Sequence, residues 1–306
     1  MKNDLLAVNI CGLKLCSPAA LASGVLGYTA ESLQYVAKCG AGAVVTKSIG
    51  VNPRVGYPNP TIVQAECGII NAMGLPNPGI EEYRAEIKFT KELMQIPLIV
   101  SVYGYTSEEY ALVTQKAAES GADAIELNVS CPHVQFTGSE IGGNPKLLMD
   151  VVSKTKAATQ KPIIVKLSPN VTDIVEIAKA AVKAGADALT VINTVRALAV
   201  DIDTQRPILA NKRGGLSGSA IKPVALRCVY DVYEALPKTP IFGCGGISNW
   251  HDAIEFFLAG ASALQVGTAL ATEDAIFKNI NRGVANYLKK KGYGGVKEIV
   301  GISHQD

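Results

Sequence analysis

GADAIELNVSCP, residues 121–132, contains the pattern that decides the fold. A helical stretch ends in a glycine–alanine pair, an apolar strand follows, and polar residues close the strand. The pattern occurs four times, with copies that begin at Gly40, Gly121, Gly185 and Gly260. Repeated helix-to-strand joints of this kind are typical of parallel strands connected by helical crossovers. The repeat therefore predicts a parallel sheet whose strands end, with their polar residues, on one rim.

Eight apolar segments can be assigned as strands, and amphipathic patterns separate them. The expected strands are 19–23, 43–48, 98–102, 125–129, 163–167, 189–193, 241–243 and 264–267. Helices are expected to begin at Thr106 and at Asp173, where side chains can cap exposed amides, and to span 220–236 and 249–258. The alternation favours a (β/α)8 TIM barrel, and an open sheet with extra strands is the alternative.

Both ends of the barrel carry further predicted features. Residues 8–18 (VNICGLKLCSP) alternate around a glycine, as a small hairpin does, and this N-terminal hairpin could plug the barrel floor. Three connections, 50–78, 132–144 and 195–218, follow strand ends and are too long to be simple turns. Long connections without structure of their own are usually functional or disordered. We expect them to form loops over the carboxyl-end rim, where active sites of such barrels lie.

Size and composition exclude several classes of protein. The chain has 306 residues, of which 48% are hydrophobic and 18% charged, and this fits a single barrel domain over residues 1–306. The sequence contains no run of about 18 apolar residues, so a membrane span is not expected. The net charge is +2, and the scattered lysines do not suggest a nucleic-acid surface. Lys289, Lys290 and Lys291 are best explained as the basic end of the last helix.

The seven cysteines indicate the compartment. They occur at 11, 16, 39, 67, 131, 228 and 244, without a CxxC pair or a metal-ligand cluster. Such spacing is typical of reduced thiols in a cytoplasmic protein, and the N-terminus lacks the pattern of a secretory signal. No metal site is expected. Cys131 differs from the others because it begins a glycine-bearing loop, where the alternatives are a catalytic thiol and a packed one.

Glycines cluster at the strand ends in the last third of the chain. Residues 214–218, 243–246 and 267–268 bring three such groups together. Glycines at loop tips let backbone amides approach an anion, and barrels of this kind commonly bind a phosphate after the last two strands. The alternative is that they only form tight turns. A phosphate here predicts flavin mononucleotide (FMN), pyridoxal phosphate or a sugar phosphate.

Charged and amide side chains also close the strands. Lys47 and Lys166 each end an apolar strand, where an inward lysine can balance the negative charge of a ligand. Asn71, Asn128 and Asn193 can donate and accept hydrogen bonds together, which suits a flat heterocycle with alternating N–H and C=O groups. Snorkelling of the lysines into solvent is the alternative.

Four motifs in the same order resemble the class 1 dihydroorotate dehydrogenases. They are NVSCPH (128–133), GIINAMGLPNPG (68–79), ANKRGGLSGSAIKPVALR (210–227) and FGCGGI (242–247). The resemblance covers nearly the whole chain. The sequence around NVSCPH and RPILANKRGGLSG is most similar to the 1B branch, the catalytic subunit that pairs with an electron-transfer subunit. Class 2 enzymes use a serine base and carry an N-terminal membrane extension, whereas this chain has Cys131.

The resemblance implies a flavin-dependent oxidation of dihydroorotate to orotate in pyrimidine (UMP) biosynthesis, with Cys131 as the general base. The implied substrate contacts are Lys47, Asn71, Ala72, Met73, Gly74, Leu75, Asn128, Asn193 and Thr194. The implied FMN contacts are Ser23, Lys47, Ser48, Ser101, Asn128, Lys166, Ile192, Gly218, Gly245, Gly246, Gly267 and Thr268. At Ser101 the family usually has an asparagine, and serine is shorter and offers fewer hydrogen bonds.

The 1B resemblance further implies a partner. A separate subunit with FAD and a [2Fe–2S] cluster would pass electrons to NAD, because this chain has neither clustered cysteines nor a GxGxxG motif after a strand. A homodimer of this chain with two partners is the expected assembly. The alternatives are a fumarate-using 1A-type enzyme, a related dihydropyrimidine dehydrogenase, a flavin-free barrel isomerase or aldolase, and a flavin carrier without turnover.

Overall fold

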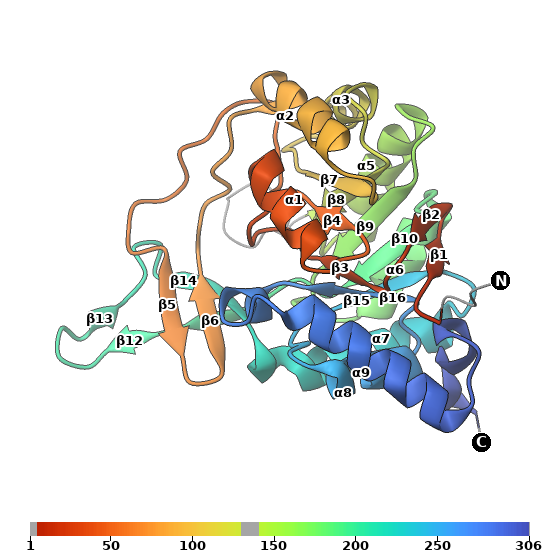
Figure 1. Cartoon of the computed structure of the whole chain (residues 1–306). Coiled ribbons are helices and arrows are strands. Elements are labelled where there is room, and N and C mark those ends of the chain that lie inside the picture. Colours follow the sequence, from red (N-terminus) through yellow and green to blue (C-terminus); the bar gives the residue numbers. More distant parts are fainter. Residues whose placement is uncertain (1–4, 130–140, 306) are drawn as a thin grey trace.

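A closed barrel of eight parallel strands forms the centre of the computed structural model, which describes residues 5–129 and 141–305 (Figure 1). The strands follow the order of the chain around the barrel, and each is hydrogen-bonded in parallel to its neighbours. They are β3 (Ala19–Leu21), β4 (Val44–Val45), β7 (Leu98–Val102), β8 (Ala124–Asn128), β9 (Ile163–Leu167), β10 (Ala188–Val191), β15 (Ile241–Cys244) and β16 (Ala263–Val266). The predicted (β/α)8 barrel is confirmed, and each of the eight predicted strands overlaps one of these.

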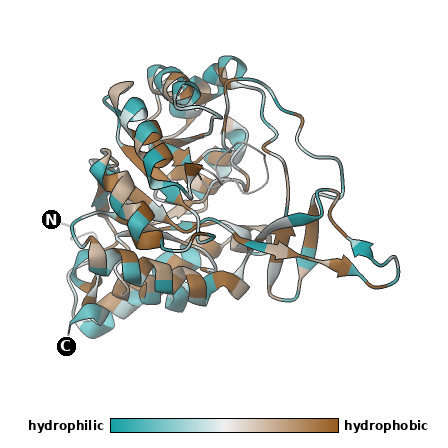
Figure 2. Ribbon diagram, turned by 180° about the vertical axis from the view of Figure 1, so that it is seen from behind, coloured by the Kyte–Doolittle hydropathy of each residue, from teal (hydrophilic) through white to brown (hydrophobic). Residues whose placement is uncertain are grey.

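Helices surround the barrel, and two of them begin at the caps that the sequence predicts, Thr106 and Asp173. Thr106, Asp173 and Asn249 accept hydrogen bonds from the first backbone amides of their helices. The helices are α1 (Ala30–Lys38), α2 (Ile80–Leu93), α3 (Ser107–Glu119), α5 (Pro145–Ala157), α6 (Ile174–Lys183), α7 (Lys222–Ala235), α8 (Trp250–Leu258) and α9 (Ile276–Lys291). In Figure 2 hydrophilic and hydrophobic residues alternate along the helices, as expected for helices with one face on the barrel.

The barrel interior is filled in layers because alternate residues of each strand point inward. The lowest layer is apolar and fully buried, and it consists of Ala20, Val45, Ile99, Ala124, Ile164, Ala188, Phe242 and Ala263. Two short strands, β1 (Val8–Ile10) and β2 (Leu13–Leu15), pair as an antiparallel hairpin beneath it. Ile10, Leu13 and Leu15 pack into this layer, so the predicted hairpin closes the barrel floor.

Two of the three long connections contain strands that the sequence analysis did not assign. β5 (Ile62–Ala65) and β6 (Gly68–Asn71) pair with β14 (Arg213–Ser217) and β11 (Val195–Leu198) in a four-stranded antiparallel sheet. A smaller hairpin, β12 (Val200–Asp201) with β13 (Arg206–Pro207), extends from it. We call these six strands the projecting sheets; they extend away from the barrel at the left of Figure 1. The connections 50–78 and 195–218 are thus long excursions from the barrel, as predicted, but they have strands of their own.

The described cysteines and the short helical turns are distributed over the whole fold. Cys11, Cys16, Cys39, Cys67, Cys228 and Cys244 are all free thiols. Short 3-10 helices follow β14, β16 and α9, at Ser219–Ile221, Thr268–Ala271, Val296–Ile299 and Ile302–His304. No helix in the described ranges has both the length and the apolar character needed to cross a membrane.

Candidate active site

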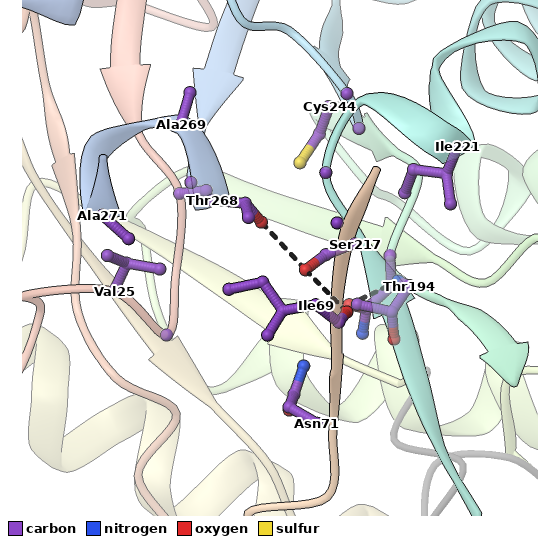
Figure 3. Close-up of a pocket in the computed structure, with 18 of the residues that line it drawn as sticks. Val25, Ile69, Asn71, Thr194, Ser217, Ile221, Cys244, Thr268, Ala269 and Ala271 are labelled. Atoms are coloured by element: carbon purple, nitrogen blue, oxygen red, sulfur yellow. Dashed lines mark hydrogen bonds between the residues drawn. The ribbon is translucent and has the colours of Figure 1, made fainter. Parts of the chain in front are cut away.

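A cavity of about 830 Å³ opens at the carboxyl ends of the barrel strands, beside the projecting sheets (Figure 3). Its walls contain most of the site residues that the sequence predicts. These are Ser23, Lys47, Ser48, Asn71, Met73, Gly74, Leu75, Asn128, Lys166, Ile192, Asn193, Thr194, Gly218, Gly245, Gly246, Gly267 and Thr268. The volume lies in the range of about 300–1,000 Å³ that is usual for ligand and cofactor sites.

Three polar residues from β8, from β7 and from the segment after β4 form a hydrogen-bonded chain that starts at one wall of the cavity. The side-chain amide of Asn128 donates to the hydroxyl of Ser48 across 2.9 Å. The hydroxyls of Ser48 and Ser101 are also 2.9 Å apart. Ser101 is fully buried and, unlike Ser48 and Asn128, is absent from the described cavity lining. Ser101 therefore lies behind Ser48 and does not line the cavity, whereas the resemblance implies a direct contact with the cofactor.

The segment after β6 supplies a second wall. Asn71 ends the strand and donates weakly to the carbonyl of Gly215, 3.4 Å away. Gly74 has a φ of 76°, and a Cβ there would lie 2.6 Å from the backbone of Tyr57. Ala72 is buried against Ile70 and does not line the cavity. Close packing of the two chain segments thus leaves Asn71, Met73 and Leu75 at the cavity.

Asn193 and Thr194 follow β10 and are fixed by local hydrogen bonds. The amide of Thr194 donates to the side-chain oxygen of Asn193 across 2.9 Å. Asn170 donates to the carbonyl of Thr194, also across 2.9 Å. A Cβ on Gly215 would lie 2.1 Å from the Thr194 hydroxyl, so only glycine fits at this point of β14. The segment after β10 therefore packs closely against β14, and both Asn193 and Thr194 line the cavity.

The glycine groups of the last third converge on the opposite side of the cavity. Gly218, Gly245 and Gly246 have φ values of 98°, 122° and 78°, which favour glycine strongly. A Cβ on Gly246 would also meet the backbone of Lys222 at 2.7 Å. The hydroxyl of Thr268 donates to Ser217, which in turn donates to the carbonyl of Ile69 (Figure 3). Such a cluster of glycines at a cavity wall forms a backbone cradle of the kind that receives a phosphate.

Lys47 and Lys166 reach the cavity from different depths. Lys47 follows β4, is partly exposed, and its backbone amide donates to the carbonyl of Gly27 across 2.7 Å. Lys166 lies within β9 and is buried, with its ammonium at the cavity floor. Both positions agree with the predicted placement of the lysines at the barrel mouth. Two cations on one cavity suit an anionic ligand.

Comparison with known proteins identifies the family. The family model described as dihydroorotate dehydrogenase matches residues 5–288. This chain belongs to the dihydroorotate dehydrogenase family. Members are flavin-dependent oxidoreductases, and the polar residues gathered at the cavity match the four motifs by which the sequence resembles them.

The chain is similar over nearly its whole length to several catalytic subunits named dihydroorotate dehydrogenase B (NAD(+)). That of Pyrococcus abyssi is 53% identical over 300 residues, which cover 98% of this chain and 99% of the relative. That of Methanocaldococcus jannaschii is 50% identical and covers 100% of both chains. The Methanosarcina mazei subunit is 48% identical over 99% of this chain and 97% of its own.

A solved structure supports the fold. The crystal structure of a dihydroorotate dehydrogenase from Eimeria tenella, in complex with ferulenol, superposes with a TM-score of 0.87. The superposition covers 100% of this chain and 90% of the other, at 24% sequence identity. At that identity the comparison shows a shared barrel architecture.

One predicted residue and one predicted loop lie largely outside the described part of the chain. Cys131, the expected base of a dihydroorotate dehydrogenase, is among residues 130–140, which are not described, and so is most of the connection 132–144. Asn128 and Val129, which precede them, are described. Asn128 lines the cavity, and its backbone carbonyl accepts a hydrogen bond from Tyr110 across 2.9 Å.

The sequence analysis missed several residues that the cavity contains. Gln64 and Cys67 come from the β5–β6 hairpin, whose strands were not predicted. Cys244 and Gln265 line the floor, and Glu126 lies beneath them. A signal existed for the last two, because Gln265 and Glu126 are polar residues at alternate, inward positions of otherwise apolar strands.

Proposed function

We propose that this chain is the catalytic subunit of an NAD-linked dihydroorotate dehydrogenase, which oxidises (S)-dihydroorotate to orotate in pyrimidine biosynthesis. The observation that carries the proposal is the cavity at the carboxyl ends of the barrel strands, because all four family motifs contribute residues to it. Relatives that are 48–53% identical over almost the full chain carry the corresponding name. We further propose that residues 1–306 act as one domain, in the cytoplasm.

FMN fits the side of the cavity that contains the glycines. Gly218, Gly245, Gly246 and the turn at Gly267 and Thr268 would hold its phosphate, because these glycines line the cavity and let backbone amides approach an anion. Ser23, Ser48, Asn128, Lys166 and Ile192 would contact the rest of the cofactor. When bound, FMN supplies the chemistry of hydride acceptance.

The remaining side of the cavity suits the substrate. Lys47 would pair with the substrate carboxylate, and Asn71, Asn128 and Asn193 would hold the N–H and C=O groups of its ring. Thr194 and the segment from Met73 to Leu75 would complete the pocket. Such contacts fix the ring relative to the cofactor, which turns the reaction into a positioned, nearly unimolecular event.

Cys131 would act as the general base. It would remove the proton from C5 of dihydroorotate as C6 gives up a hydride, and the C5=C6 double bond of orotate forms from the electron pair left at C5. The proton would then pass from the Cys131 thiol to solvent. The connection 132–144 would cover the substrate during this step and exclude water.

The electrons must leave the chain after each turnover. The relatives' names describe catalytic subunits, and this supports a separate electron-transfer subunit for the present chain. We propose that the subunit carries FAD and a [2Fe–2S] cluster and passes electrons to NAD. A homodimer core of this chain with two such partners would be the complete enzyme.

A visible spectrum and an anaerobic titration test the proposed function. The purified protein should show a flavin spectrum that bleaches on stoichiometric addition of dihydroorotate. A colourless protein that does not take up FMN would contradict the flavin assignment. Flavin that binds but is not bleached would contradict the substrate.

The electron acceptor needs a second assay. The isolated chain with dihydroorotate should reduce neither NAD nor fumarate rapidly, and NAD reduction should appear when the co-purifying subunit is added. Rapid fumarate reduction by the chain alone would instead identify a 1A-type enzyme without a partner.

A further inference from the structure

A layer of polar side chains is buried inside the barrel, between the apolar floor and the cavity. Glu126 is fully buried in β8, and one of its carboxylate oxygens accepts hydrogen bonds from Thr190 at 2.9 Å and from Gln265 at 2.6 Å. Lys166 donates to the side-chain oxygen of Gln265 across 3.3 Å. The four residues come from β8, β9, β10 and β16, on different sides of the barrel.

The second carboxylate oxygen of Glu126 has no hydrogen-bond partner among the described residues. It lies 3.8 Å from the ammonium of Lys166, which is too long for a hydrogen bond but close for an ion pair. A fully buried carboxylate with an unbonded oxygen is costly, and such groups in native proteins usually have a specific role. Here the carboxylate is positioned to act on one group, the ammonium of Lys166.

Lys166 separates Glu126 from the cavity. The lysine lines the cavity floor, as do Gln265 and Cys244, whereas Glu126 is absent from the described lining. The carboxylate therefore reaches any ligand through the lysine and not by contact. Gln265 bonds both partners, since its amide nitrogen donates to Glu126 and its oxygen accepts from Lys166.

The charge of Lys166 depends on these surroundings. Burial by itself would lower the pKa of the Lys166 ammonium, but its neighbours Cys244 and Glu126, each in its ionised form, raise that pKa above its usual value. Burial in turn raises the pKa of the Cys244 thiol, which disfavours the ionised form of Cys244. Glu126 is then the acidic group in ion-pair distance that keeps the lysine charged.

We propose that Glu126 is a positioning residue that keeps Lys166 charged and holds its ammonium at the cavity floor, where the ammonium stabilises a reduced, anionic flavin. The inference rests on the proposed function, because it takes FMN as the ligand above Lys166. Glu126 does not touch the cofactor and acts through the lysine. Removing its charge lowers the affinity for reduced flavin more than the affinity for oxidised flavin.

The first experiment measures the ratio of the affinities for reduced and oxidised FMN. Glu126→Gln preserves the size of the side chain and removes its charge. We expect the ratio to fall about tenfold, which corresponds to a midpoint potential lower by about 30 mV for a two-electron couple. Lys166→Met should lower the ratio at least as much. Glu126→Gln in the Lys166→Met background should then change it less than about threefold, because coupled residues are not additive.

Other roles of Glu126 give different results. If Glu126 only screened the positive charge, its removal would raise the ratio, and that result would overturn the proposal. An equal fall in both backgrounds would do the same, since Glu126 would then act without Lys166. Thr190→Val is the packing control, because it removes one hydrogen bond in the same layer and leaves the carboxylate in place. If Thr190→Val changed the affinity ratio as much as Glu126→Gln, packing of the layer would explain the effect, and the proposal would be overturned.

A second measurement is independent of the cofactor. Thermal unfolding of the apoproteins should show a lower Tm for Glu126→Gln and for Lys166→Met. Each variant leaves the buried charge of the other residue without its opposite charge. The double variant should recover most of the loss, whereas additive losses would overturn the pairing. Failure of the wild type to bind FMN would overturn the proposed function and the flavin part of the inference, while the Tm cycle would still decide whether the pair is coupled.

Discussion

Asn128 donates its side-chain amide to Ser48 across 2.9 Å, and the Ser48 hydroxyl lies at the same distance from that of Ser101. The relationship joins the ends of β8 and β4 to the middle of β7. It also gives a place to Ser101, where the resemblance implies an asparagine. The shorter side chain does not reach the cavity and instead supports Ser48, which does.

Ser101→Ala should weaken FMN binding about 2- to 12-fold. The expectation follows from the loss of one buried hydrogen bond, which contributes about 0.5–1.5 kcal/mol. FMN titration of the apoprotein measures the change. The control is Thr114→Val, since the Thr114 hydroxyl is buried in α3 and has no hydrogen-bond partner in the part of the chain that the structure describes. Unchanged FMN affinity in Ser101→Ala would mean that Ser48 is held by Asn128 alone.

Cys131→Ser should leave FMN bound and slow its reduction by dihydroorotate by about 10²–10⁴-fold, as expected for a lost general base. The remaining rate should rise with pH, because a serine hydroxyl has a much higher pKa than a thiol and its basic, ionised form becomes more populated as the pH rises. Stopped-flow bleaching of the flavin measures the step directly. Cys16→Ser, at an exposed cysteine beside the floor hairpin, is the control. Equal rates in wild type and Cys131→Ser at neutral pH would remove Cys131 from the mechanism.

Lys47→Ala should weaken orotate binding by about 10- to 150-fold. A lost charge-assisted contact to a carboxylate costs about 1.5–3 kcal/mol. Titration of the holoenzyme with orotate, followed by the flavin spectrum, measures the affinity. Lys14→Ala removes an exposed lysine on β2 and should have no effect. Loss of FMN instead of orotate would assign Lys47 chiefly to the cofactor.

Gly246→Ala should abolish or strongly weaken FMN binding, by at least about tenfold. The added Cβ would meet the backbone of Lys222 at 2.7 Å, so the cradle must shift. Gly292→Ala is a matched control, because Gly292 has nearly the same φ, 79° against 78°, with nothing within 4 Å of its Cβ. The control should lose about 1 kcal/mol of stability and keep its FMN affinity. Equal FMN loss in both variants would mean that general strain, and not the cradle, is responsible.

The barrel could be predicted because its signals are local. Each Gly-Ala joint marks the end of a helix and the start of a strand, and the caps at Thr106, Asp173 and Asn249 mark helix starts. The cavity residues could be predicted because the motifs stand at strand ends, which one rim brings together. Their ligands remain proposals.

The projecting sheets could not be predicted from local patterns. β6 pairs with β14, and the paired residues Asn71 and Gly215 are 144 positions apart in the chain. β14 contains two glycines, Gly214 and Gly215, which disfavour a strand by propensity and are required here by close packing. The buried layer is similar, because Glu126 is visible as a polar residue in β8 but its partner Gln265 is 139 positions away.

The floor hairpin has a consequence for the order of events in turnover. Ile10, Leu13 and Leu15 close the amino end of the barrel, so substrate and product enter and leave the cavity through its opposite end. A dissolved acceptor such as fumarate would have to wait for orotate to depart before it could enter. Electron transfer to a docked partner protein does not require orotate to leave the cavity first. If the acceptor is a partner subunit, electrons can leave the flavin by a route that does not pass through the cavity opening. Reoxidation can then begin while orotate is still bound.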